Sequence, residues 1–243
     1  MTKNILITGA SKGLGLELVC QLMQVNTYKV YCISRSMSPE LEKLRVDNKG
    51  RIKWLCLDLG GDIDYRKEIF DEFVGKDVPL HGLVNNAAFA YDDIATNAQI
   101  SSLLHMFKVN TFAPMFLTKY FLRHMLLNRN KVSIIHISSI SVHTGYKGLS
   151  MYAASKGALE AYSKNISREW GEKGVRSNTI VAGFMETNMS STLSTEQKDR
   201  IYKRNSLKIP TTLESVASTI IFLLGEGSSS ITGQNLHVDS GTI

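Results

Sequence analysis

Residues 5–19 read ILITGASKGLGLELV, and this stretch decides the fold. An apolar run passes into the glycine-rich segment Thr8–Gly15, and a helix-forming segment follows it directly. A strand, a glycine turn and a helix in that order form an anion site, because glycine lets the backbone approach a phosphate and the first helical N–H groups favour its charge. The spacing TGxxxGxG differs from the commoner GxGxxG fingerprint. Since it follows the first strand, it predicts a dinucleotide site rather than a simple helix entry.

The rest of the chain repeats this alternation of short apolar runs and helix-length segments. Most of the runs are continuously apolar, as strands buried on both faces of a parallel sheet are. We therefore expect an α/β fold: one Rossmann-type domain over residues 1–243, with a doubly wound parallel sheet of strand order 3-2-1-4-5-6 and a seventh strand appended. The expected strands are Asn4–Thr8, Lys29–Ile33, Ile52–Leu57, Gly82–Asn85, Val132–Ile137, Ser177–Val181 and Asn235–Val238, and the expected helices include Leu14–Gln24, Ile100–Leu127, Ala153–Trp170 and Leu213–Leu224.

Composition narrows the class of protein. The chain has 243 residues and a net charge of +6, but its basic residues are scattered, which argues against a nucleic-acid surface. Its three cysteines form no CxxC pair, so neither a disulfide framework nor a metal site is expected, and a reducing cytoplasm suits them. No apolar run is long enough for a signal peptide or a membrane span.

The residues after the second strand indicate which dinucleotide binds. Enzymes that use NAD place an acid near this strand end to hold the ribose 2′-hydroxyl. Here the strand runs into Ser34-Arg35-Ser36, which has no carboxylate. Arg35 offers a guanidinium fork that suits a 2′-phosphate, and Lys12 in the glycine turn adds a second positive charge. An exposed loop arginine is the alternative, but together the two cations favour NADP(H).

A second group of residues suggests acid–base chemistry. Tyr152 and Lys156 are four positions apart, so they share one face of a helix. A nearby ammonium favours the phenolate form of a tyrosine and lowers its pKa. Ser139 follows an expected strand, at the sheet edge where open α/β folds gather their ligands. Each feature alone is weak, since such pairs and strand-end serines arise by chance, and only their conjunction with the glycine turn points to a site.

Several segments together resemble the short-chain dehydrogenase/reductase family, and the resemblance runs from end to end. The spacing of thirteen between Ser139 and Tyr152 is one of its marks. The segments that carry it are Thr8–Gly15, Asp58, Asn85–Ala88, Asn110, Ser139, Tyr152–Lys156, Val181–Thr187 and Ile231–Asp239.

The resemblance implies a role for each of these positions. Tyr152 is then the general acid/base, Lys156 lowers its pKa and binds the nicotinamide ribose, Ser139 orients the substrate carbonyl, and Asn110 holds a helix kink and a relay water. A locally bonded asparagine is the alternative for Asn110, and a helix-capping acid is the alternative for Asp58. The implied cofactor contacts are Gly9, Ser11, Lys12, Gly13, Leu14, Gly15, Arg35, Asp58, Leu59, Asn85, Ala87, Tyr152, Lys156 and Thr187.

Within the family the pattern is most similar to the 3-oxoacyl-(acyl-carrier-protein) reductases, which implies a homotetramer or a dimer and a carrier-bound or small-molecule ketone. Ala88, Ala182 and the segment Lys208–Pro210 depart from their usual residues. A sugar, a polyol or a secondary-metabolite ketone is an alternative substrate, beneath an expected lid over residues 185–208. A nucleotide-sensing regulator is a further alternative. A basic group could dock an acidic carrier protein or be ordinary surface: Arg129, Lys131, Arg168 and Lys173.

Overall fold

The computed structural model describes residues 2–186 and 194–242, and the predicted sheet is present. Seven parallel strands follow the order β3-β2-β1-β4-β5-β6-β7, as expected. The expected bounds hold to within two residues, and β5 runs two residues further than predicted, so Ser139 is its last residue. The strands are β1 Lys3–Thr8, β2 Tyr28–Ser34, β3 Ile52–Cys56, β4 Gly82–Asn85, β5 Val132–Ser139, β6 Val175–Ala182 and β7 Asn235–Val238.

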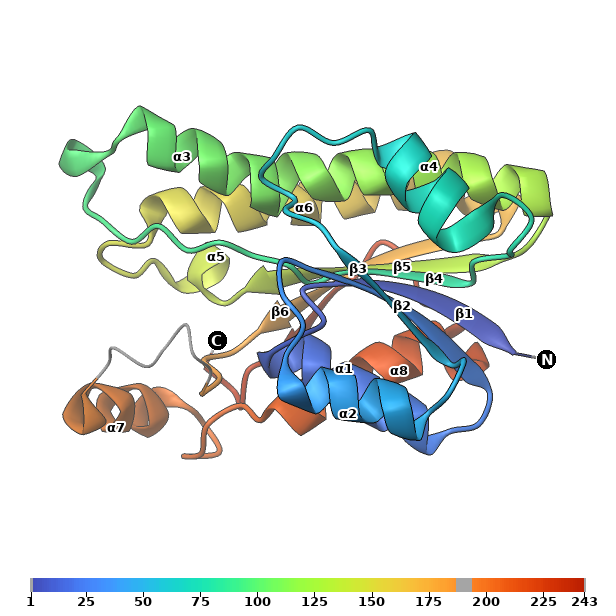
Figure 1. Cartoon of the computed structure of the whole chain (residues 1–243). Helices are drawn as coiled ribbons and strands as arrows, with labels where there is room; N and C mark the ends of the chain where they lie inside the picture. Colours follow the sequence, from blue (N-terminus) through green and yellow to red (C-terminus); the bar gives the residue numbers. More distant parts are fainter. Residues whose placement is uncertain (1, 187–193, 243) are drawn as a thin grey trace.

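Helices cover both faces of the sheet (Figure 1). One apolar cluster packs α1 and α8 beneath the sheet, and the other packs η1, α4 and α6 above it. The helices are α1 Gly13–Gln24, α2 Pro39–Asp47, α3 Ile100–Phe107, α4 Ala113–Asn128, α5 Ser141–Thr144, α6 Ser150–Trp170, α7 Thr195–Arg204 and α8 Leu213–Leu224, with π-type segments η1 Tyr65–Gly75 and η3 Lys108–Phe112 and short 3-10 turns η2 Ala95–Asn97, η4 Gly171–Lys173 and η6 Glu226–Ser228.

The long helix expected over 100–127 is interrupted by a widened turn. It runs as α3, η3 and α4 without leaving the helical path. Pro114 explains the turn, because a proline lacks the N–H that would bond to Asn110 four residues earlier and its ring crowds that carbonyl. Asn110 therefore sits at a bulge in the helix, and its side chain is completely buried.

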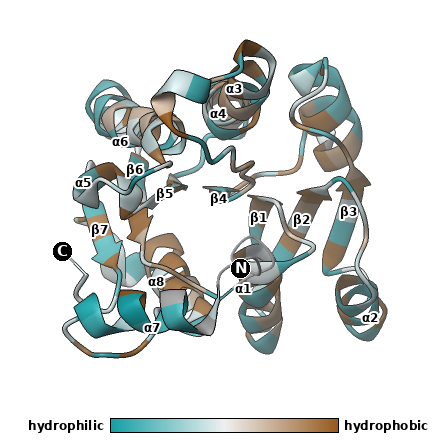
Figure 2. Cartoon of the chain, turned by 90° about the vertical axis from the view of Figure 1, so that its left-hand side faces the viewer, coloured by the Kyte–Doolittle hydropathy of each residue, from teal (hydrophilic) through white to brown (hydrophobic). Residues whose placement is uncertain are grey.

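The carboxyl ends of the strands meet at one edge, and Figure 2 looks onto the molecule from this side. The glycine turn, the end of β5, the start of α6 and the short helix α5 all lie at this edge. Within the described residues no helix has the length and apolar character that a membrane crossing requires. Cys20, Cys32 and Cys56 are free thiols.

Candidate active site

Two glycines of the turn are packed so closely against their neighbours that neither could carry a side chain. Gly9 has a φ of +68°, and a Cβ there would lie 2.9 Å from the Cα of Ala87. A Cβ on Gly15 would lie 2.1 Å from the carbonyl oxygen of Gly9. Asn86 fixes this contact, since its Nδ2 donates to the carbonyls of Thr8 and Gly9 at 3.0 and 3.1 Å. The start of α1 is therefore held against the end of β1, in a contact that leaves no space for a Cβ at either glycine.

A hollow opens between the glycine turn and the start of α2. Lys12 lines it and is exposed, whereas Ser11 and Leu14 beside it are buried. Arg35 is exposed at the end of β2, outside the lining, so only one of the two predicted cations borders the hollow. Glu40 adds a carboxylate to this lining, which the prediction of an NADP(H) site from Lys12 and Arg35 did not include. The residues that line the hollow are Ser11, Lys12, Gly13, Leu16, Ser36, Met37, Ser38, Pro39 and Glu40.

The remaining expected cofactor residues lie at the same sheet edge, but several are occupied by structural contacts. Asp58 is exposed after β3, and its Oδ1 accepts from the N–H of Gly60 at 3.0 Å. Leu59 is buried in the apolar cluster above the sheet. The N–H of Ala87 donates to Thr8 Oγ1 at 3.0 Å. The Asn85 side chain is buried, and its Nδ2 lies 3.2 Å from Nδ1 of His136.

Ser139, Tyr152 and Lys156 come together at the end of β5 and the first two turns of α6. Tyr152 is half-buried, and the Lys156 ammonium lies 5.9 Å from the centroid of its ring. Nζ of Lys156 donates to the carbonyl of Ile137, two residues before Ser139, at 2.8 Å. Ser139 is half-buried and is paired in register with Ala182 on β6. The three side chains predicted from spacing are thus held by one strand and one helix.

The protonation of this group is governed mainly by burial. The expectation that Lys156 lowers the pKa of Tyr152 is wrong for this structure: burial, and secondarily the Asp92 carboxylate, raise that pKa to about 12. Burial lowers the pKa of Lys156 to about 8 and, with the charge of Lys156, lowers the pKa of His136 to about 3. In the chain without ligands, the phenol therefore keeps its proton at neutral pH, which is the state needed to donate to a carbonyl oxygen.

Asn110 joins the loop after β4 to α6, the helix that carries Tyr152 and Lys156. Its Oδ1 accepts from the N–H of Phe89 at 2.8 Å, and its Nδ2 donates to the Phe89 carbonyl at 2.9 Å and to Ser155 Oγ at 3.0 Å. Both of its polar atoms are used by these contacts. Asn110 lies at a helix distortion, as the family resemblance implies, and in this state it holds the loop after β4 against α6.

The basic group considered for docking lies at the wrong end of the sheet. Arg129 and Lys131 precede β5 and Lys173 precedes β6, so all three lie at the amino edge. Arg168 is in the last turn of α6, sixteen residues or about 24 Å along the helix from Tyr152. These residues are not placed to hold a carrier protein beside the reactive hydroxyls.

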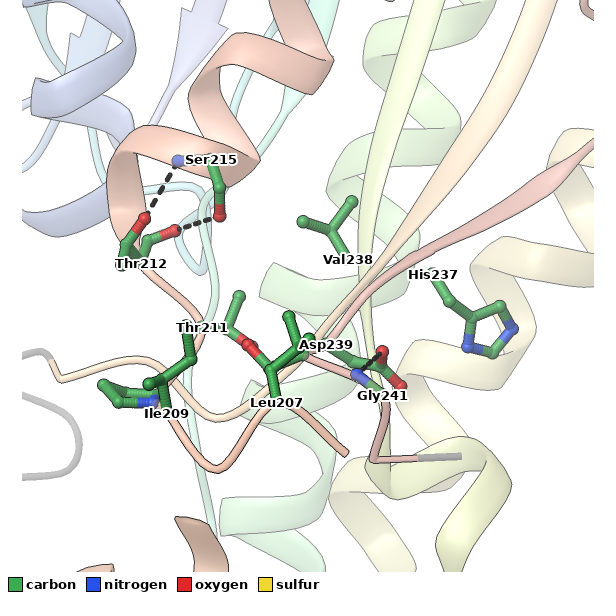
Figure 3. Close-up of a pocket in the computed structure, with 11 residues that line it drawn as sticks. Leu207, Ile209, Thr211, Thr212, Ser215, His237, Val238, Asp239 and Gly241 are labelled. Carbon is green, nitrogen blue, oxygen red and sulfur yellow. Dashed lines mark hydrogen bonds between the residues drawn. The ribbon is translucent and has the colours of Figure 1, made fainter. Parts of the chain in front are cut away.

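The expected lid is described only in part. Thr187 lies outside the described residues, as does the segment 187–193 around it. Beyond that segment, α7 leads to a hollow bordered by Leu207, Ile209, Thr211 and His237 (Figure 3). None of the expected site residues lines this hollow.

Three residues near the site were not predicted from the sequence. Ser141 bonds to Ser139, and Glu160 accepts from side chains of β5, α5 and β7. Asp92 acts on Tyr152 from the loop after β4. Glu160 had a recognisable signal: it follows Lys156 by four residues, so it shares the buried face of the same helix. Ser141 and Asp92 had none, because both lie in segments that the sequence shows only as loops.

Comparisons with known proteins identify the family of the chain. A family model described as Enoyl-(Acyl carrier protein) reductase matches residues 9–242. The chain is 30% identical to the 3-oxoacyl-(acyl-carrier-protein) reductase FabG of Buchnera aphidicola subsp. Schizaphis graminum, covering 98% of this chain and 96% of that one. It is 27% identical to the L-xylulose reductase of Caenorhabditis elegans, covering 98% and 95%.

Solved structures show the same fold. ElxO with NADP bound superposes with a TM-score of 0.87 at 30% identity, covering 100% of this chain and 99% of that one. A 4-hydroxyisoleucine dehydrogenase complexed with NADH superposes with a TM-score of 0.90 at 21% identity, covering 99% and 98%, and this likeness concerns the fold alone.

Proposed function

The chain belongs to the short-chain dehydrogenase/reductase family and is an oxidoreductase that interconverts alcohols and carbonyls with a nicotinamide cofactor; we propose that it uses NADP(H) to reduce a 3-oxoacyl thioester to the secondary alcohol. The observation that carries this proposal is that Ser139, Tyr152 and Lys156 lie at the same carboxyl edge of the sheet as the glycine turn. The full-length likeness to a FabG reductase supports the acyl substrate. Residues 1–243 form one domain in this proposal, since the seven strands share one sheet.

The residues divide the reaction between them. The reduced nicotinamide supplies a hydride when it is bound. Tyr152 donates its proton to the substrate oxygen, and burial keeps that proton on the phenol until the oxygen becomes negative. Ser139 donates a hydrogen bond to the same oxygen, which stabilises the charge that develops there. Lys156, held at the Ile137 carbonyl, orients the cofactor ribose and returns a proton toward Tyr152. Asn110 holds the loop after β4 against α6, since both polar atoms of its side chain bond to Phe89 and Ser155.

The preference for NADP(H) rests on two positive charges near the end of β2. Lys12 borders the hollow beside α2, and Arg35 is exposed directly after β2, outside the lining of that hollow. Glu40 opposes them, because a carboxylate in the lining repels a 2′-phosphate and can bind a 2′-hydroxyl. Binding of NADPH and of NADH should therefore be compared for the wild type and Glu40→Gln, and a wild type that binds NADH more tightly would contradict the preference.

The experiment that tests the chemistry is NADPH oxidation with a short 3-oxoacyl thioester. Tyr152→Phe keeps the ring and removes the proton donor, and we expect the rate to fall by about 10²–10⁴-fold with cofactor binding retained. Tyr162→Phe is the matched control, since Tyr162 lies ten residues further along the same helix and its hydroxyl bonds to the Met115 carbonyl at 3.5 Å and to Thr118. Equal rates for wild type and Tyr152→Phe would overturn the assignment.

A second candidate keeps the chemistry and changes the ketone to a sugar or polyol. It is favoured by the likeness to L-xylulose reductase, which covers 98% of this chain. A panel of ketoses, polyols and 3-oxoacyl thioesters, each with NADPH and NADH, separates the two substrates. A regulator that senses the nucleotide would bind NADPH and turn over no member of the panel.

We also infer assembly into a tetramer or a dimer. Four large apolar side chains between residues 100 and 116 are 46–69% exposed, which is costly for an isolated chain. They are Ile100, Leu104, Phe112 and Phe116. Light scattering of the purified protein measures the assembly, and a monomeric mass would contradict it.

A further inference from the structure

Ser141 makes a pair of contacts to the reactive serine that nothing in the proposed chemistry assigns. Its hydroxyl donates to Ser139 Oγ at 3.0 Å, and its backbone N–H donates to the same oxygen at 3.2 Å. Ser141 is 3% exposed, so bulk water does not compete for these bonds. It is the first residue of α5, which follows β5 after Ile140 alone.

These two contacts leave Ser139 with a single hydrogen-bonding capacity. A hydroxyl has one proton to donate and two lone pairs that can accept. Because Ser141 occupies both lone pairs of Ser139 Oγ, the hydroxyl proton is what remains. Ser139 can then donate to a substrate oxygen but cannot accept a proton from a substrate hydroxyl, so it does not compete with Tyr152.

The position of Ser141 is itself held from two sides. The N–H of Ile140 donates to the carbonyl of Ala182 on β6 at 3.0 Å, which fixes the turn between the two serines. His143, two residues after Ser141, lies 3.0 Å from Oε2 of the buried Glu160. The short helix is thus attached to β6 and to α6, which holds Ser141 beside Ser139.

We propose that Ser141 is a positioning residue that makes Ser139 a dedicated hydrogen-bond donor to the substrate oxygen. The inference rests on the proposed function of Ser139. Hydrogen bonds in a chain polarise one another, so the bond from Ser141 strengthens the one that Ser139 gives. The effect grows as negative charge develops on the oxygen, and it therefore acts on the transition state more than on substrate binding.

A double-mutant cycle tests this proposal with the same ketone and NADPH assay. We expect Ser141→Ala to lower kcat by roughly three- to tenfold, as the loss of one hydrogen bond does, with KM little changed. In a Ser139→Ala background, Ser141→Ala should have no further effect, since there is no hydroxyl left to orient. Ser141→Thr keeps the hydroxyl and should recover most of kcat.

The matched control is Ser163→Ala, which removes another buried serine–serine bond, between Ser163 and Ser177 at 2.9 Å, deep along α6. It should leave kcat unchanged. If Ser141→Ala fails to fold, Ser141→Cys keeps the size of the side chain with a weak donor, and the same loss of kcat is expected.

Two results would overturn the proposal: an equal loss from Ser141→Ala in both backgrounds, or no loss in either. They are distinguishable from a failure of the proposed function itself. That failure appears as a wild type without turnover, or as a Tyr152→Phe variant that is as fast as the wild type, and it would overturn this inference as well.

Discussion

Two successive turns of α6 each bury a charged side chain, and the two charges differ in how many hydrogen bonds they receive from the fold. Lys156 and Glu160 are four residues apart on one face, and they are 1% and 7% exposed. The carboxylate of Glu160 accepts from Ser138, from His143 and from Asn235. Among the described residues, the ammonium of Lys156 makes one hydrogen bond, to a backbone carbonyl.

The number of hydrogen bonds distinguishes the two charges: Glu160 has a structural role, and Lys156 is available to a ligand. A buried charge is tolerated when hydrogen bonds replace its lost hydration, and Glu160 has such bonds from three elements of the fold. Lys156 has two donors to spare, and burial lowers its pKa to about 8. Polar groups left short of partners at the carboxyl edge of a sheet are what a cofactor can satisfy. The lysine therefore costs stability that the glutamate does not.

Replacing the lysine should produce the largest change in stability. The pKa of Lys156 falls from 10.5 to about 8 on folding, so the unfolded chain binds more protons between those values and stability rises with pH across that window. Lys156→Met should therefore stabilise the protein by about 3 kcal/mol at pH 7, while abolishing turnover. Chemical unfolding followed at pH 7 and above pH 10.5 measures the gain, which should vanish at the higher pH.

Lys164→Met on the same helix is the control for that prediction. Lys164 is exposed, so its replacement should change stability little at either pH. A Lys156→Met protein less stable than the wild type at pH 7 would show that the ammonium is satisfied in the fold, and the contrast with Glu160 would be lost.

Replacing the glutamate should have a somewhat smaller effect of the opposite sign. Glu160→Gln keeps the shape but presents an amide NH₂ to donors that need an acceptor. Bonds to a charged acceptor contribute about 1.5–3 kcal/mol, so we expect a loss near 2 kcal/mol. The same unfolding experiment measures it, with the exposed Glu169→Gln on the same helix as control. A change below that of the control would mean that the three bonds contribute nothing net.

The two turns also mark what the sequence could predict and what it could not. The spacing of Tyr152 and Lys156 placed them on one face, and the apolar pattern of β5 placed Ser139 at its end, because helix and strand periodicity are local properties. The partners of Glu160 lie 22, 17 and 75 residues away, so only the assembled sheet brings them together. The interrupted helix at Asn110 was predictable in principle, since Pro114 stands four residues later.

Loops account for most of what sequence reasoning missed. The segment expected as a loop between β5 and α6 contains the helix α5, whose four residues are too few to show a period. Charge alone predicted that Arg35 and Lys12 both hold a 2′-phosphate. In the structure only Lys12 borders the hollow beside α2. Charge identifies which ion a surface attracts, whereas the course of the backbone decides which side chains meet it.

The smallest expected effect is a shift in the pH profile on replacing Asp92, which lies outside α6. Asp92 is exposed in the loop after β4, and its carboxylate raises the pKa of Tyr152 by less than burial does. Asp92→Asn should therefore lower the pKa of Tyr152. The protonated phenol is the donor in the reduction, so the alkaline fall of kcat/KM should move to lower pH. Asp93→Asn is the control, because the Asp93 carboxylate bonds locally to Ile94 and Asn97 and should leave the profile in place. A larger shift from Asp92→Asn in high salt than in low salt would contradict the electrostatic origin, since salt screens exposed charges and leaves buried ones almost untouched.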